Sequence, residues 1–270
     1  MQGLKNSVNK KQIIFIVIFA IIECVSLFFL WRYLVTVRHA ERKMLYIQEN
    51  YIKIPDHAVS DQDSTPLSNE TADAPSFSIP KLEIDFEALQ KEVNSDIYSW
   101  ILIPDTPINY PIVQHPDDNA YYINHNLDGS EGYPGCIYTE NYNFKDWEDT
   151  NTILYGHNMR NGSMFSKINS FARKDFFEEH PYIYLYSADA IRVYQVFAAY
   201  EFSDLHLMTV CDWNDPEAVS QFFSTASAYP GNFDKTVELQ DDGHYLTLST
   251  CRNFKKDKRF LVHAMLVFQE

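Results

Sequence analysis

Residues 245–264, YLTLSTCRNFKKDKRFLVHA, contain two β-type runs joined by a basic loop. The first run ends at Cys251 and the second begins at Arg259. If the runs are hairpin neighbours, Cys251 and Arg259 lie side by side at one rim of a sheet. Nearby cations favour a thiolate, and this loop supplies Arg252, Lys255, Lys256, Lys258 and Arg259. Cys251 is the best candidate for a nucleophile, although a core cysteine beside a solvated basic turn fits these residues too.

Short runs of β-branched and aromatic residues recur upstream and predict an all-β barrel or sandwich. They lie at 108–114, 135–141, 152–158, 182–186 and 191–202, and a last run covers 259–269. Apolar residues at helical spacing predict a short helix at 84–93 and two inserted helices, at 164–179 and from 216 to about 228. The hydrophobic content of 46% is enough for one sizeable core.

The N-terminal part predicts an anchor and a linker ahead of this domain. Residues 13–31 are apolar except for Glu23 and are long enough to cross a bilayer as a helix. No small-x-small cleavage site follows, which favours an uncleaved anchor over a signal peptide. Within residues 32–78, the stretch from 38 to about 51 suits a juxtamembrane helix that continues from the anchor, and 60–78 is a flexible Asp/Ser/Thr/Pro-rich linker. The predicted division is therefore 1–12, 13–31, 32–78 and a catalytic domain at 79–270.

The charge distribution excludes a polyanion as partner. Residues 1–43 contain seven Lys/Arg and two acids, which leaves 15 basic and 35 acidic residues downstream. Such an acidic domain is repelled by nucleic acid. No phosphate loop, dinucleotide fingerprint or zincin helix occurs, and Cys136 and Cys211 fit buried structural thiols. We expect neither a cofactor nor a metal.

A second sequence feature with catalytic potential lies at 152–159, TILYGHNM, where a predicted strand leads into Gly156 and His157. A lone histidine is more often structural. A cysteine and a histidine at strand ends of one small β domain, however, are the two parts that nucleophilic thiol catalysis requires.

Together, LSTC followed by Arg259, the upstream YGHNM and the N-terminal anchor resemble the sortases of Gram-positive bacteria. The resemblance covers most of residues 80–270. The runs PIVQHPDDNAYYINHN and YGHNMRNGSMFSKI, with the helix placed before the LSTC strand, resemble class B sortases in particular.

The resemblance implies an eight-stranded β-barrel with N-terminal and inserted helices. It also implies a cysteine transpeptidase that cleaves a C-terminal sorting signal after Thr and joins the surface protein to a peptidoglycan cross-bridge amine or, in some relatives, to a pilin subunit. By the same resemblance Cys251 is the nucleophile, His157 the acid–base group and Arg259 the group that holds the substrate backbone or the oxyanion.

The resemblance further suggests substrate contacts at Asn119, Tyr155 and Ser249, each of which could equally be structural. Some class B enzymes carry an acid two residues after the cysteine, where this chain has Asn253, so a Cys-His-Asp triad has no support. Family topology implies a single-pass protein with a cytoplasmic N-terminus, lipid around the N-terminal helix and the barrel outside the cell.

Two other functions remain open at this point. A papain-like thiol hydrolase would transfer the acyl group to water, but it places its cysteine at a helix start and before its histidine. An anchored binding module without catalysis would not depend on Cys251.

Overall fold

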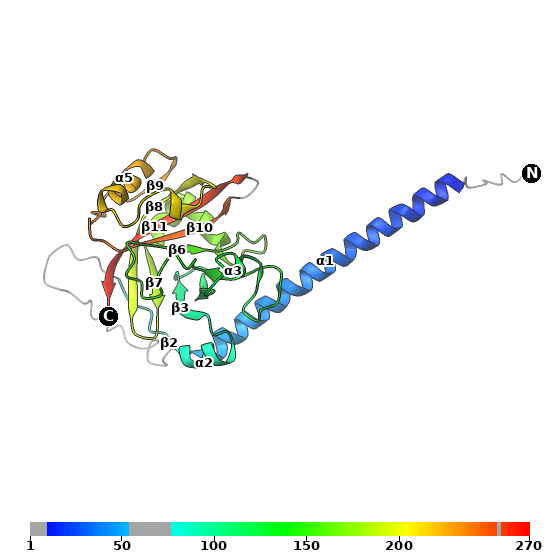
Figure 1. Cartoon of the computed structure of the whole chain (residues 1–270), viewed down its shortest axis with the longest axis horizontal. Helices are drawn as coiled ribbons and strands as arrows, with labels where there is room; N and C mark the ends of the chain where they lie inside the picture. Colours follow the sequence, from blue (N-terminus) through cyan, green and yellow to red (C-terminus); the bar gives the residue numbers. More distant parts are fainter. Residues whose placement is uncertain (1–9, 54–76, 253–254) are drawn as a thin grey trace, which may run out of the picture.

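The computed structural model describes residues 10–53, 77–252 and 255–270. The expected linker at 60–78 falls almost entirely outside the described residues, as does Asn253. The N-terminal part begins with one long helix, α1 (Lys10–Tyr51), followed by β1 (Ile52–Lys53), which pairs with β2 (Glu83–Ile84). In Figure 1, α1 runs along one edge of the folded body and projects far beyond it.

The strands of the main sheet close into a barrel. They are β3 (Ile97–Leu102), β4 (Asn109–Val113), β5 (Ile137–Tyr138), β6 (Asn151–Tyr155), β7 (Tyr182–Tyr186), β8 (Ile191–Ser203), β10 (Tyr245–Arg252) and β11 (Lys255–Gln269). The order is β11-β10-β6-β5-β4-β3-β7-β8, and β8 pairs back onto β11. In the described residues this makes a closed eight-stranded barrel, and β9 (Gly231–Phe233) adds to β8 outside the ring.

Alternating side chains fill the two faces of this barrel, as the period of a strand requires. Val196, Leu248 and Val262 point into the main core, whereas their sequence neighbours Phe197 and Leu261 belong to a second cluster. That second cluster lies under α5 (Pro216–Ala226), whose Val219 and Phe223 are buried. The alternation that predicted strands from the sequence therefore also determines which side chains face the barrel interior.

The predicted helices are present, with one difference. The helix expected at 84–93 is α2 (Phe86–Glu92), and α3 (Tyr121–Asn124) is a single short turn. The segment at 164–179 is not one helix: it divides into η2 (Phe165–Ala172), of 3-10 type, and α4 (Lys174–Glu179). Extended backbone at Arg173 separates them. A further short turn, η3 (Leu207–Thr209), precedes α5.

Capping explains where two of the helices begin. Asp215 accepts a hydrogen bond from the Glu217 amide at 3.0 Å, and Pro216 occupies the first position of α5, where its missing N–H costs nothing. Asp85 caps α2 in the same way through the Ala88 amide, at 2.9 Å.

The cysteines outside the catalytic candidate are free thiols. Cys136 is buried and Cys211 half-buried. Burial raises the pKa of both thiols, which keeps them protonated at neutral pH. Neither thiol has the electropositive surroundings of a reactive cysteine.

Candidate active site

Three neighbouring strands bring the predicted catalytic residues to one end of the barrel. Strand β10 pairs with β11 so that Cys251 lies directly opposite Arg259. On its other side β10 runs parallel to β6, with Ser249 opposite Tyr155. Cys251 and His157 each follow two residues later, Cys251 within β10 and His157 just past the end of β6. We call this end of the barrel, residues 155–159, 249–252 and 255–259, the catalytic rim.

Hydrogen bonds continue the β6–β10 pairing past the last paired residues. The Gly156 amide donates to the Ser249 carbonyl at 3.2 Å, and the Thr250 hydroxyl donates to the Gly156 carbonyl at 2.6 Å. The Asn158 side-chain amide donates to the Cys251 carbonyl at 2.8 Å. These bonds fix the backbone on both sides of His157 to the backbone around Cys251.

Gly156 is required at the turn that leads to His157. A Cβ at this position would lie 2.5 Å from the Ile137 side chain and 2.8 Å from the Phe165 ring. The absence of a side chain lets the backbone lie directly on the core, which places the imidazole at the rim.

The imidazole of His157 has a defined orientation. Its Nε2 lies 2.6 Å from the Ile123 carbonyl, at the end of α3. A carbonyl oxygen only accepts, so this Nε2 carries a proton and Nδ1 is the nitrogen that can exchange one. The ring of Tyr133 packs edge-on against the imidazole at 5.1 Å. The imidazole is half-buried, whereas Cys251 is exposed.

Two cations of the basic loop are paired with an acid from a different strand. Glu201 on β8 accepts from Lys255 Nζ at 2.8 and 2.9 Å and from Arg252 Nε at 3.2 Å. Arg252 also donates to the Asn169 side chain at 2.8 Å. Glu201 offsets the charge of these two cations, so they contribute less positive charge at the rim than the sequence suggested, and Arg259 is the cation in register with the thiol.

The three predicted substrate residues lie in different settings. Ser249 is buried and is the register partner of Tyr155, so both precede the catalytic pair by two residues. The ring of Tyr155 stacks on Tyr138 at 5.5 Å. The Asn119 side chain instead accepts from the Asn141 amide at 2.7 Å, which fastens the loop before α3 to the segment after β5. A substrate role for all three stays a prediction.

Tyr138 is a site residue that the sequence did not single out. It lies on β5 opposite Tyr155, and the charges of both Cys251 and Arg259 act on its hydroxyl. Burial, and then the Glu140 carboxyl, raise the pKa of Tyr138 and of Tyr155, so both hydroxyls remain protonated. No pattern in the residues around Tyr138 marks it, because strand pairing alone brings it here.

A hydrogen-bonded contact between His206 and Glu140 joins the segment after β5 to the segment after β8. His206 Nε2 lies 2.7 Å from the Glu140 carboxylate. Burial raises the pKa of Glu140, and the hydrogen bond with His206 partly opposes that rise.

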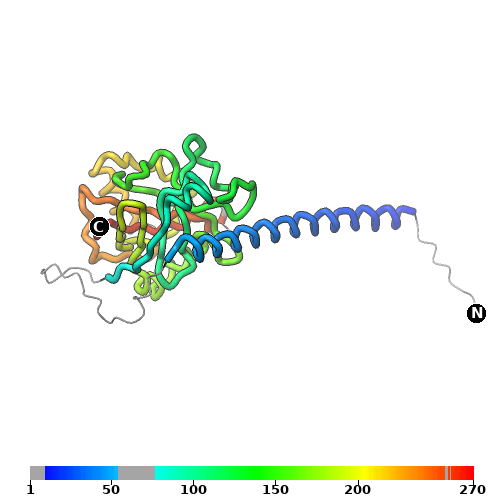
Figure 2. Tube along the Cα trace, turned by 90° about the horizontal axis from the view of Figure 1, so that it is seen from below, coloured from blue at the N-terminus to red at the C-terminus, as the bar shows by residue number. Residues whose placement is uncertain are grey.

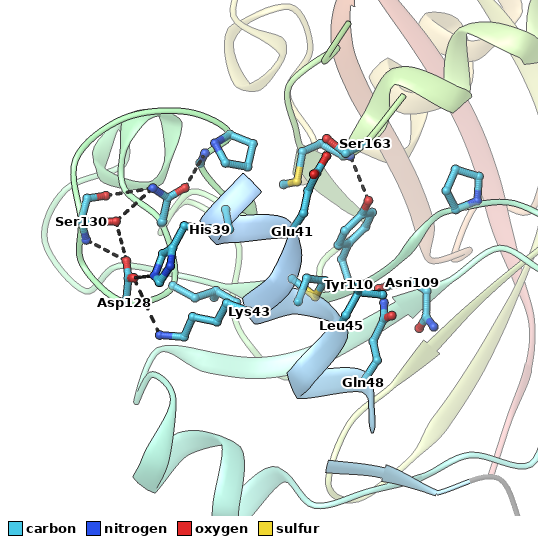
Figure 3. A pocket seen from close by; sticks show the side chains of 18 of the residues that line it. His39, Glu41, Lys43, Leu45, Gln48, Asn109, Tyr110, Asp128, Ser130 and Ser163 are labelled. Carbon is cyan, nitrogen blue, oxygen red and sulfur yellow. Dashed lines mark hydrogen bonds and ion pairs between the residues drawn. The ribbon is translucent and has the colours of Figure 1, made fainter. Parts of the chain in front are cut away.

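A separate cavity of about 510 Å³ lies between α1 and the barrel (Figure 3). Its lining includes Glu41 and Gln48 from the helix and Tyr110 from the barrel. None of the three predicted catalytic residues lines it, so the cavity is a feature of the helix–barrel contact. Among the residues that the structure describes, no cluster of three or more His, Cys, Asp or Glu is arranged to hold a metal ion.

Comparisons with known proteins agree with this geometry. The family model of the sortase domain matches residues 101–267. Sortase B of Listeria monocytogenes is 34% identical over 185 residues, covering 66% of this chain and 72% of that protein. Sortase B of Staphylococcus aureus is 30% identical, covering 67% and 74%.

Solved structures of sortase B proteins also resemble the chain in fold. A Staphylococcus aureus sortase B–substrate complex matches with a TM-score of 0.60 and 28% identity, covering 67% of this chain and 83% of that one. Clostridium perfringens sortase B matches with a TM-score of 0.62 and 26% identity, covering 67% and 99%. The likeness therefore includes both the fold and the sequence.

Proposed function

This chain belongs to the sortase family, and we propose that Cys251, His157 and Arg259 carry out its reaction. It is a cysteine transpeptidase of the class B type, which anchors surface proteins to the cell wall. The observation that supports the assignment of residues is the strand register, which pairs Cys251 with Arg259 and places Ser249 opposite Tyr155, two residues before Cys251 and His157.

In the first half of the reaction the Cys251 thiolate attacks the carbonyl carbon of the Thr in the sorting signal. The C–N bond breaks and a thioester forms between the substrate and Sγ. His157, in its imidazolium form, donates a proton to the leaving amine. Its Nε2 is held by the Ile123 carbonyl, so we assign this proton to Nδ1.

In the second half an amine attacks the thioester. The neutral imidazole of His157 accepts a proton from this amine, a new amide bond forms and the C–S bond breaks, which restores the thiol. We propose a peptidoglycan cross-bridge amine as the acceptor, with a pilin amine as the alternative that the same chemistry allows.

Arg259 stabilises negative charge next to the thiol. Its guanidinium is permanently charged and presents several donors in a planar fork, which suits the developing oxyanion or the substrate backbone. Because Arg259 is the cross-strand partner of Cys251, its charge stays near the thiol through both halves of the reaction.

We propose that Tyr155, Ser249 and Asn119 contact the sorting signal. Tyr155 and Ser249 are register partners just before the catalytic pair, so a peptide that reaches Cys251 passes them. Support for Asn119 is weaker, since its side chain already bonds the Asn141 amide.

The membrane arrangement is also part of this proposal. Helix α1 is long and apolar enough to cross a membrane, and its apolar window is not buried in the protein. We propose that residues 13–31 span the bilayer once, with residues 1–12 in the cytoplasm and the catalytic domain outside.

The test uses the full chain in detergent, a panel of quenched sorting-signal peptides and an oligoglycine or diaminopimelate amine. Mass spectrometry of the products distinguishes amide from acid. Cys251→Ala is compared with Cys211→Ala, which removes a half-buried thiol on another part of the surface.

An amide product that is lost in Cys251→Ala and kept in Cys211→Ala supports the proposal. Release of acid alone would support the hydrolase alternative. Equal inactivity of wild type and Cys251→Ala on every peptide would return the anchored binding module to consideration.

A further inference from the structure

Helix α1 is part of the folded body and not only an anchor. Ile47 is fully buried and Val37 is 7% exposed, and both belong to core clusters of the barrel. Gln48 donates to the Asn109 carbonyl at 2.7 Å. The second half of α1 is thus packed on the barrel without a break from the apolar first half (Figure 2).

Charged side chains fasten the same stretch of α1 to two loops. His39 and Lys43 lie 3.4 and 4.0 Å from the Asp128 carboxylate (Figure 3). Glu41 accepts a hydrogen bond from the Asn161 side chain. Asn161 follows His157 by four residues, so one of the two loops is the segment that continues from the catalytic rim after His157.

The first turns of α1 beyond residue 31 contact the residues around His157. The ring of Tyr33 packs on that of Tyr133 at 6.2 Å, and Tyr133 packs on His157 at 5.1 Å. A Cβ built on Gly132 would lie 3.5 Å from the Thr36 methyl. These contacts connect the point where the helix leaves the bilayer to the catalytic imidazole through one aromatic side chain.

The connection between anchor and barrel is made by α1 and β1, before residue 54. Ile52 and Lys53 leave α1 and pair at once with Ile84 and Glu83, and the Asp85 amide donates to the Tyr51 carbonyl at 3.0 Å. Helix α1 is therefore joined to the domain at residues 51–53, and the distance between membrane and barrel is determined by α1.

These contacts limit the distance between the membrane and the catalytic site. Tyr33 lies two residues past Trp31, about 3 Å of helix. With about 4 Å from the Tyr33 backbone to its ring and the two ring contacts, His157 lies within roughly 20 Å of the end of the span, whereas the headgroup layer is about 6 Å thick. In Figure 1 the end of β10 and the start of β11 also lie on the side toward which α1 projects.

We propose that α1 is a rigid strut that holds the catalytic rim just above the lipid headgroups, with the membrane surface as the partner of this face of the barrel. The proposal rests on the membrane span and on the catalytic role of His157 given above. Residues 44–270 carry a net charge of about −20 and are repelled by an anionic lipid surface, so the docked helix, and not attraction to lipid, has to keep the rim near the membrane. A flexible tether would let the barrel move away, and a docked helix does not.

The first experiment measures the distance and needs no turnover. The full chain without its exposed and half-buried native thiols (Cys24→Ser, Cys211→Ser, Cys251→Ala) receives one fluorophore at Glu131→Cys, next to Tyr133, or at Glu217→Cys on α5, away from the projecting helix. It is reconstituted in phosphatidylcholine vesicles that carry a headgroup-attached quencher.

We expect strong quenching at residue 131 and weak quenching at residue 217. Seven polar, helix-forming residues inserted between Trp31 and Arg32 raise the barrel by about 10 Å and reduce the quenching at 131. The same insertion between Asp63 and Ser64 leaves it unchanged. Equal quenching at the two positions, or equal effects of the two insertions, overturns the proposal whether or not the chain is an active transpeptidase.

The second experiment measures function with the same insertions in the chain that keeps Cys251. A sorting-signal peptide attached to a lipid is compared with the same peptide free in solution. We expect the insertion after Trp31 to lower the rate on the lipid-attached peptide at least tenfold and to leave the rate on the free peptide unchanged, because the contacts from Tyr33 onward remain. An unchanged ratio of the two rates contradicts the strut.

Discussion

Replacement of Ile47 by Ala tests whether α1 belongs to the folded catalytic unit. Ile47 is fully buried in the cluster that also contains Leu89 and Trp100. The truncation removes three carbons at about 0.8 kcal/mol each and leaves a cavity, so the expected loss is about 3 kcal/mol. For a domain of this size that corresponds to a fall in Tm of roughly 6–12 °C.

The measurement is thermal unfolding of the full chain in detergent, followed by near-UV circular dichroism. Leu45→Ala is the matched control, since Leu45 lies two residues earlier on the same helix and is 57% exposed. Its effect should stay within about 0.5 kcal/mol. If Ile47→Ala lowers Tm no more than Leu45→Ala does, residues 36–51 are not packed on the barrel and the strut proposal fails with them.

Three further predictions concern the rim and the core. Arg259→Lys keeps the positive charge and loses the planar, forked set of guanidinium donors. We expect kcat/KM for transamidation to fall about 100-fold, while iodoacetamide alkylates Cys251 at nearly the wild-type rate. An unchanged kcat/KM would exclude a role of the guanidinium in holding the oxyanion or the substrate backbone. Glu201→Gln leaves Arg252 and Lys255 without their carboxylate, so alkylation of Cys251 at neutral pH should become faster; a slower reaction would show that Glu201 acts by position instead. Burial lowers the pKa of His263 to about 3, below its unfolded value near 6.5. As pH falls, the unfolded chain therefore binds this proton before the folded chain does. Folding stability is lost below about pH 6.5, by up to ~1.4 kcal/mol per pH unit. His263→Gln should flatten this slope in urea unfolding between pH 7 and 5, and an equal slope would contradict the assignment.

Much of the barrel could be predicted from local patterns. The run at 191–202 and the two runs of 245–264 alternate or concentrate β-branched and aromatic residues, and they form β8, β10 and β11. Strand β3, at 97–102, was not predicted: it follows α2 closely and Ser99 interrupts its apolar run, although that hydroxyl is buried and donates to the Tyr186 carbonyl. Local patterns identify strands, but the order β6-β10-β11 depends on pairings between distant segments.

The N-terminal segment shows that composition is insufficient to predict whether a helix packs on the domain. Residues 38–51 were predicted as a helix that continues from the anchor, and the structure has this helix in α1. Whether such a helix is free or docked depends on what it meets, and Ile47 alone gives no sign of a partner in the sequence. The contacts with Asp128 and Asn161 come from loops far along the chain. The boundary predicted at residue 79 therefore stays a hypothesis, and we propose that the catalytic unit includes residues 36–53.

The electrostatic field at the Cys251 thiol shows that the local sequence is equally insufficient for predicting the active site. Counting cations after Cys251 suggests that the whole basic loop acts on the thiolate. Closure of the barrel by β8 against β11 brings in Glu201, 50 residues earlier in the chain than Cys251, and this carboxylate binds Arg252 and Lys255. What distinguishes Arg259 is therefore its pairing with Cys251 across β10 and β11. Hence a cation moved one residue along β11 would lie on the other face of the strand, so position should affect catalysis more than the number of charges does.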